Sequence, residues 1–106
     1  MEREPIKRTR TKERIPCNLD VVINGSLSCK AFDISEGGLY VYSDHFFNPG
    51  NVVNVSLEFG GEKLEIKARV KHAHEGVGMG LMFIDLDDGL KSRVRKLISE
   101  VRQPAV

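Results

Sequence analysis

The sequence predicts a mainly β protein: an antiparallel barrel, closed or half-closed, with a basic arm before it and one helix after it. Apolar and polar residues alternate in several short segments between positions 17 and 84. Glycine, asparagine and proline punctuate these segments at short intervals, and no helical period interrupts them. Short strands separated by frequent turns are typical of small β-barrels.

The composition indicates one globular domain with a single modest core. The chain has 106 residues, of which 41% are hydrophobic and 29% charged, both ordinary values for a soluble protein. No apolar stretch approaches the length that spans a bilayer, and the N-terminus is charged. We therefore expect a cytoplasmic protein without membrane insertion.

Residues 1–13 show no apolar period and are expected to form a flexible basic arm. The barrel and its helix should occupy 14–102, and 103–106 should form a tail. Residues 1–14 hold six basic and three acidic side chains, although the whole chain carries a net charge of only +1. A basic arm on a near-neutral body suggests an anionic partner. A solvated terminus without a partner would explain the same charges.

From Cys17 the pattern becomes β, and the turn residues at 24–26 divide the first strand from the second. A three-residue loop pairs Ile23 with Leu27 and places Cys17 opposite Asp33. In this register the apolar side chains of both strands lie on the same face of the hairpin. A two-residue Asn-Gly turn would mix the faces, so the first register is preferred.

In that register Cys17 and Cys29 lie about 13 Å apart along the hairpin, at about 3.3 Å per residue. A disulfide requires Cα atoms within about 7 Å of each other. We expect two reduced, buried cysteines, which fits a reducing compartment.

The same alternation continues to position 84, and a helical pattern then begins. Strands are expected at 27–33, 39–42, 53–59, 64–70 and 78–84, with a loop at 43–51. The helix, at about 87–102, should begin with Asp87 or Asp88 as its N-cap and end before Pro104. Its apolar stripe consists of Leu90, Val94, Leu97, Ile98 and Val101. The stripe needs an apolar surface to cover, either an open end or flank of the barrel or a partner protein.

Nothing in the sequence indicates an enzyme. Of its three histidines, His72 and His74 alternate on one strand face, but no well-placed third metal ligand accompanies them. Phosphate-binding and dinucleotide-binding glycine loops are also missing from the sequence. We expect no catalytic residue, no metal and no cofactor.

Two motifs instead suggest a binding site for a guanine nucleotide. Arg10 and Arg14 are spaced so that both guanidinium groups could reach phosphates or the O6/N7 edge of guanine. In the segment from Asp33 to Gly38, aspartate can accept hydrogen bonds from guanine, and the serine can donate or accept beside it. The two glycines are expected to permit positive φ and close approach of a ligand. A local turn between two strands would use the same residues.

Arg10-Thr-Lys-Glu-Arg14-Ile-Pro, followed by Asp33-Ile-Ser35-Glu-Gly37-Gly38, resembles the two-part motif of PilZ domains, bacterial receptors for cyclic di-GMP. The segment Gly78–Phe83 is similar to a glycine-rich strand of that family. The resemblance implies a six-stranded, Greek-key-like antiparallel barrel with a C-terminal helix. It also implies a set of ligand-binding residues: Arg10, Arg14, Asp33, Ser35, Gly37 and Gly38, with Arg8 and Thr9 as secondary contacts.

The expected function is to bind cyclic di-GMP, one or two molecules, and to relay its level through ordering of the arm. A separate effector protein would recognise the ligand-bound state, in a process such as motility or biofilm formation. The alternative is a nucleotide-independent adaptor for motility, pilus or secretion components. Nucleic acid is not expected as a partner, because lysine and arginine do not interleave with the aromatic residues. A monomer and a homodimer both remain open.

Overall fold

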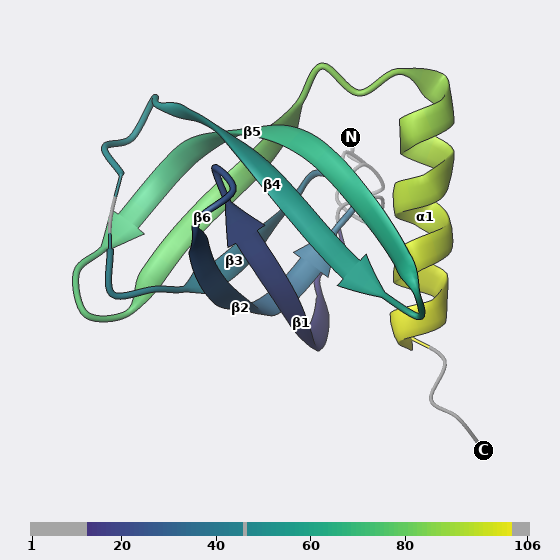
Figure 1. Ribbon diagram of the computed structural model, residues 1–106, viewed down its shortest axis with the longest axis horizontal. Helices are drawn as coiled ribbons and strands as arrows, with labels where there is room; N and C mark the ends of the chain where they lie inside the picture. Colours follow the sequence, from purple (N-terminus) through teal and green to yellow (C-terminus); the bar gives the residue numbers. More distant parts are fainter. Residues whose placement is uncertain (1–12, 46, 103–106) are drawn as a thin grey trace, which may run out of the picture.

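The computed structural model describes residues 13–45 and 47–102, which form six strands and one helix (Figure 1). Each strand falls where alternation predicts one, although several extend further at their ends. The elements are β1 (Ile15–Ile23), β2 (Leu27–Ser35), β3 (Gly38–Tyr42), β4 (Val52–Phe59), β5 (Glu62–His74), β6 (Gly78–Ile84) and α1 (Asp88–Arg102).

The six strands form a closed antiparallel barrel in the order β1-β2-β3-β6-β5-β4. Closure comes from β1, which pairs with β4 between Asp20 and Ile23. The connection from β3 to β4 leaves β3 free to pair with β6, so the neighbours differ from the chain order. The predicted fold class is confirmed, and the barrel is closed instead of half-closed.

The interior of the barrel holds the apolar set that the alternation predicts. On β5, Leu64, Ile66, Ala68 and Val70 are buried, while the residues between them are exposed. The other strands contribute in the same way, because successive side chains of a strand point to opposite faces. Polar groups of a binding site are therefore confined to the outer wall and the two ends of the barrel.

The first hairpin has the predicted three-residue loop. Ile23 pairs with Leu27, and Asn24 and Gly25 adopt the left-handed region with φ of 53° and 75°. Asparagine and glycine tolerate this region better than other residues, which explains why they occupy the turn.

Further along the hairpin, the predicted pairing of Cys17 with Asp33 is wrong. Pro16 pairs with Asp33 instead, because the register shifts between Pro16 and Leu19. Two residues of β1 face the single residue Phe32 of β2 at this β-bulge. A bulge inserts one residue into one strand and bends it. The beginning of β1 is thereby moved one residue closer to the Asp33 turn than alternation predicts.

Both cysteines are free thiols, as predicted, but only Cys29 is buried. Cys17 is half-buried, because it lies in the bulge where the alternation breaks down. Burial raises the pKa of both thiols, and the nearby charge of Asp33 raises the pKa of Cys17 further. Hydrogen bonds partly oppose these shifts, to the backbone of Leu19 for Cys17 and to Ser43 for Cys29.

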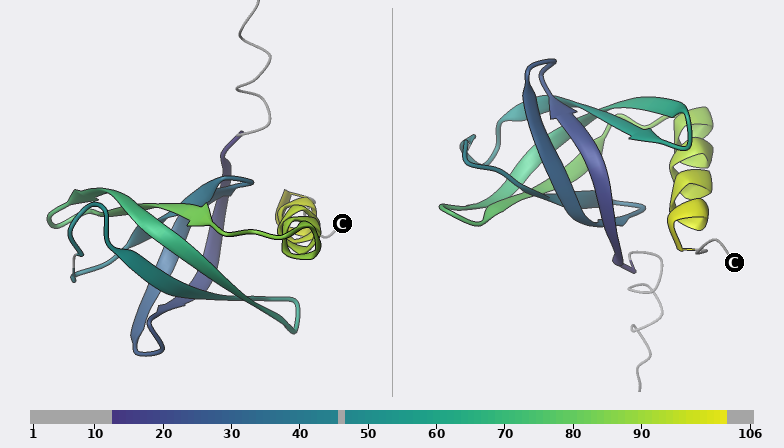
Figure 2. Two further views of the ribbon diagram at one scale, coloured as in Figure 1. Left: turned by 90° about the horizontal axis from the view of Figure 1, so that it is seen from above. Right: turned by 60° about the horizontal axis from the view of Figure 1, so that its bottom comes forward.

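Helix α1 lies beside one end of the barrel, next to the start of β1 (Figures 1 and 2). Its N-cap is Asp87, whose Oδ1 accepts a hydrogen bond of 2.8 Å from the N–H of Leu90. Val94, Leu97 and Ile98 are buried and join the core of the barrel. Of the two surfaces considered for this stripe, the barrel is the one it covers. Within the described residues, no helix combines the length and apolar character needed to cross a membrane.

Candidate functional site

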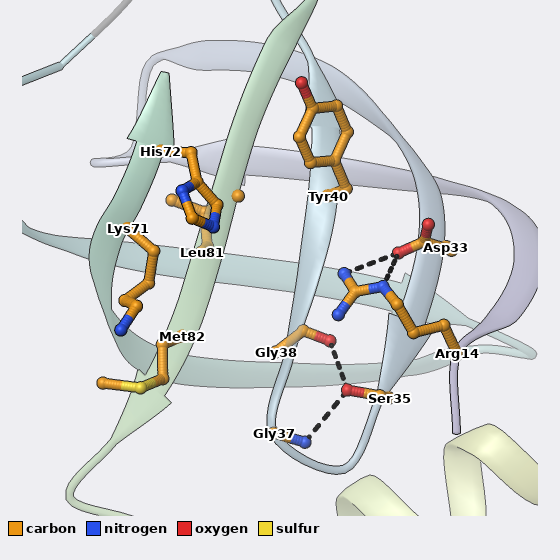
Figure 3. Close-up of a pocket in the computed structure, with 11 residues that line it drawn as sticks. Arg14, Asp33, Ser35, Gly37, Gly38, Tyr40, Lys71, His72, Leu81 and Met82 are labelled. Carbon is orange, nitrogen blue, oxygen red and sulfur yellow. Dashed lines mark hydrogen bonds and ion pairs between the residues drawn. The ribbon is translucent and has the colours of Figure 1, made fainter. Parts of the chain in front are cut away.

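A pocket of about 430 Å³ lies on the outer wall of the barrel, beside the β2–β3 turn and the start of β1 (Figure 3). Every described residue that the two sequence motifs predict is in its wall. Arg8, Thr9 and Arg10 lie outside the described residues. The lining consists of Arg14, Asp33, Ser35, Gly37, Gly38, Tyr40, Lys71, His72, Gly80, Leu81 and Met82.

Arg14 and Asp33 form an ion pair at one side of the pocket. The Nη2 and Nε atoms of Arg14 lie 2.7 and 3.0 Å from the same atom, Oδ1 of Asp33. The β-bulge permits this contact, since Pro16 pairs with Asp33 and Arg14 comes two residues earlier. Oδ2 of Asp33 and Nη1 of Arg14 have no hydrogen-bond partner among residues 13–45 and 47–102. The pair therefore presents one carboxylate oxygen and the two N–H groups of Nη1 to a ligand.

This ion pair is weak enough to rearrange when a ligand binds. The Arg14 side chain is 51% exposed and that of Asp33 30%. Ion pairs this close to solvent contribute at most about 1 kcal/mol to stability. A charged ligand that offers better hydrogen bonds could displace either partner at little cost.

The hydroxyl of Ser35 stabilises the β2–β3 turn through two local hydrogen bonds. Its side chain is buried, and its Oγ accepts a hydrogen bond of 3.2 Å from the N–H of Gly37. The same hydroxyl donates to the carbonyl oxygen of Gly38 at 3.4 Å. The carbonyl of Gly37 in turn accepts from the N–H of Phe83, which ties the turn to β6. Ser35 thus shapes the turn that presents Asp33, and its hydroxyl oxygen retains one acceptor lone pair.

Gly38 is required for packing and not for unusual backbone geometry. The expectation of positive φ is wrong for Gly37 and Gly38, because neither is among the described glycines with positive φ. A Cβ atom on Gly38 would instead overlap the carbonyl oxygen of Leu81 on β6. Gly38 therefore allows β3 and β6 to approach closely at the floor of the pocket.

The pocket also contains two rings that the motifs did not indicate: that of Tyr40, which pairs with Asp33 on the neighbouring strand, and that of His72 farther from Arg14 (Figure 3). Both flank Gly80, where a Cβ atom would lie 3.1 Å from Cδ2 of His72 and 3.6 Å from Cδ1 of Tyr40. The hydroxyl of Tyr40 hydrogen-bonds Nδ1 of His74 at 3.1 Å, and Phe32 stacks on its other side at 5.8 Å. The alternate glycines Gly78 and Gly80 were the available sequence signal for these rings. Only the register of β3, β6 and β5 shows that Tyr40 and His72 flank Gly80.

Lys71 adds a second cation on the far side of the pocket from Arg14 (Figure 3). It sits at a register shift between Val70 and His72, where β5 bulges against β6. Two cations, one carboxylate and planar rings suit a ligand with phosphates and aromatic bases. Within the described ranges there is no group of three or more potential metal ligands.

A family model described as "PilZ domain" matches residues 8–100. A search of curated proteins gives no match. Among solved structures, the PilZ domain of CeSA from a cellulose-synthesizing bacterium is 24% identical, with a TM-score of 0.70. That match covers 86% of this chain and 99% of the CeSA domain.

Two longer proteins contain a similar fold. The Bacillus subtilis inhibitor of motility MotI/DgrA is 18% identical, with a TM-score of 0.73 over 94% of this chain and 51% of its own. Borreliella burgdorferi PlzA, solved in complex with c-di-GMP, is also 18% identical, with a TM-score of 0.55 over 87% and 36%. The chain spans about half of MotI and about a third of PlzA, and at these identities the likeness concerns the fold.

Proposed function

The chain belongs to the PilZ domain family, and we propose that it is a receptor for cyclic di-GMP, which it binds without chemical change. One observation carries the proposal. Arg14 and the segment from Asp33 to Gly38 come from separate parts of the sequence, yet they line one pocket. The ion pair between Arg14 and Asp33 joins the two motifs directly.

The open groups of this pocket match the edges of guanine. Asp33 would accept hydrogen bonds from the N–H groups of the base through Oδ2. Arg14 would donate to the O6/N7 edge or to a phosphate, and Lys71 would balance phosphate charge. Gly37 and Gly38 would leave room for the base beside the turn. In this proposal Arg10, Arg8 and Thr9 complete the site from the arm.

We propose further that the bound ligand orders the arm across the barrel and that a separate effector protein recognises this state. Charge-assisted hydrogen bonds to the phosphates would offset the entropy that the arm loses. Two structural relatives support by analogy the ligand and a role in motility, but not the arm itself: PlzA was solved with c-di-GMP, and MotI is named an inhibitor of motility.

Titration calorimetry with cyclic di-GMP tests the proposal. Wild type should bind, and Arg14→Ala should bind roughly 10- to 100-fold more weakly, because charge-assisted hydrogen bonds contribute about 1.5–3 kcal/mol. Arg93→Ala is the matched control, since Arg93 lies on α1 near Glu62 and away from the pocket. It should bind like wild type.

The base can be tested in the same assay. Cyclic di-AMP lacks the O6 acceptor and the N2 donor of guanine, so it should bind far more weakly than cyclic di-GMP. No detectable binding of cyclic di-GMP by wild type at about 50 µM ligand would contradict the proposal. That result would favour the nucleotide-independent adaptor.

A further inference from the structure

A second hollow, of about 360 Å³, lies between the β2–β3 turn, β6 and α1. It shares Gly37 and Met82 with the first pocket, so the turn and the end of β6 separate the two spaces. From α1 the hollow receives Lys91 and Arg95, and from the turn it receives Glu36. We call this space the turn–helix groove.

Lys91 and Arg95 belong to a row of cations along one flank of α1. At 100° per residue, positions 91, 95 and 102 lie on the same side of the buried stripe. The row ends at Arg102, whose Nη2 lies 3.1 Å from Oε1 of Glu13, at the base of the arm. This flank therefore runs from the β2–β3 turn to the start of β1.

The two flanks of α1 differ in how their cations are paired. On the other flank, Arg93 and Lys96 lie 3.8 and 3.9 Å from the carboxylate oxygens of Glu62. Arg93 also donates a hydrogen bond of 3.2 Å to the carbonyl oxygen of Lys63. Within the described part of the chain, Lys91 and Arg95 have no carboxylate within 4.0 Å. Two exposed cations at the mouth of a groove remain available for an anion.

The groove repeats the chemistry of the first pocket. The first pocket offers a guanidinium, a carboxylate and the glycine turn through Arg14, Asp33 and Gly37. The groove offers a guanidinium and a carboxylate through Arg95 and Glu36 on the other side of the same turn. Cyclic di-GMP likewise contains two identical halves, each with a guanine and a phosphate.

We propose that Lys91, Arg95 and Glu36 form a second guanine nucleotide subsite, on the other side of the β2–β3 turn from the first pocket. The two cations bind a phosphate, and Glu36 accepts hydrogen bonds from the donor edge of a guanine. This inference rests on the proposed function. The occupant is a guanosine phosphate unit, supplied by the far half of the bound cyclic di-GMP or by a second molecule of it.

The test compares two double variants by titration calorimetry with cyclic di-GMP. Lys91→Gln/Arg95→Gln removes two charges from the groove flank of α1. Arg93→Gln/Lys96→Gln removes the same charge from the opposite flank. Because all four side chains are exposed, both variants should keep the wild-type helix content by circular dichroism.

The groove variant should bind cyclic di-GMP at least about tenfold more weakly than the control variant, or it should bind half as many ligand molecules per chain. A fall from two ligands per chain to one assigns the groove to a second molecule. An unchanged ratio of one with weaker binding assigns it to the far half of a single ligand. Equal affinity and equal stoichiometry in the two variants would overturn the subsite but leave the proposed function intact. Absence of binding by wild type would overturn both.

Discussion

The single residue with the strictest packing requirement at the site is Gly38. A methyl group there would overlap the backbone carbonyl of Leu81, which cannot move without separating β3 from β6. At Gly80 the nearest obstacle is the His72 side chain at 3.1 Å, which can rotate away. Gly38→Ala should therefore reduce the free energy of unfolding by about 2 kcal/mol or more, and Gly80→Ala by clearly less. Urea denaturation of both variants checks this, and equal losses would contradict the packing argument.

The buried thiol of Cys29 should make stability depend on pH. Burial raises its pKa above the ordinary 9.0, so the folded protein holds this proton more tightly than the unfolded chain does. The contribution of this thiol to the free energy of unfolding is fully present below about pH 9. It falls at higher pH, where the same thiol ionises in the unfolded chain. The free energy of unfolding should decline as the pH rises above about 9, and less steeply in Cys29→Ala. Identical slopes for wild type and Cys29→Ala would show that this thiol is not responsible.

Residue identities alone indicated part of the site. Arg14 and Asp33 could be proposed from their chemistry, because a guanidinium and a carboxylate can both hydrogen-bond guanine, although a local turn would also explain Asp33. The rings of Tyr40 and His72 could not be, since they meet only through the register of three strands. For Ser35 the sequence allowed a turn role and a ligand role, and its hydroxyl bonds to Gly37 and Gly38 within the turn.

Among the elements, α1 depends most on a single polar contact at its start. Asp87 caps the helix through the N–H of Leu90, while Asp88 is already the first helical residue. Asp87→Ala should destabilise the protein by about 1 kcal/mol, and Asp88→Ala by a few tenths. Thermal unfolding of the two variants measures the difference. A larger loss from Asp88→Ala would show that the cap is assigned to the wrong residue.

Strand positions followed from alternation, but the β-bulges did not. The pattern of apolar residues on β1 is continuous from Cys17 to Ile23, so nothing in it reveals that two residues face Phe32. The bulge at β5 is equally hidden, although it brings Lys71 and His72 to the pocket. A third register shift, between Ala31 and Asp33 where β2 pairs with β3, is hidden in the same way. All three lie near the site, where they turn side chains away from the regular alternation.

For the whole molecule, the pairing of β3 with β6 could not be derived from local pattern. The strands are separated by β4 and β5 in the sequence, yet they form the floor on which Gly38 and Gly80 lie. Each described strand has a neighbour on both sides, although β1 pairs with β4 only between Asp20 and Ile23, so we expect side chains and turn backbone to supply most contacts to a ligand. The outer wall beside the β2–β3 turn provides both.

The most direct test of the account is a titration of the ¹⁵N-labelled protein with cyclic di-GMP, followed by amide chemical shifts. If cyclic di-GMP binds in this pocket, saturable shifts should centre on Arg14, the turn from Asp33 to Gly38, and Gly80 to Met82. Amides of the β1–β4 wall, near Asp20 and Asn54, should stay in place. Shifts confined to that wall, or no saturable shifts at all, would contradict the assignment of this pocket as a cyclic di-GMP site.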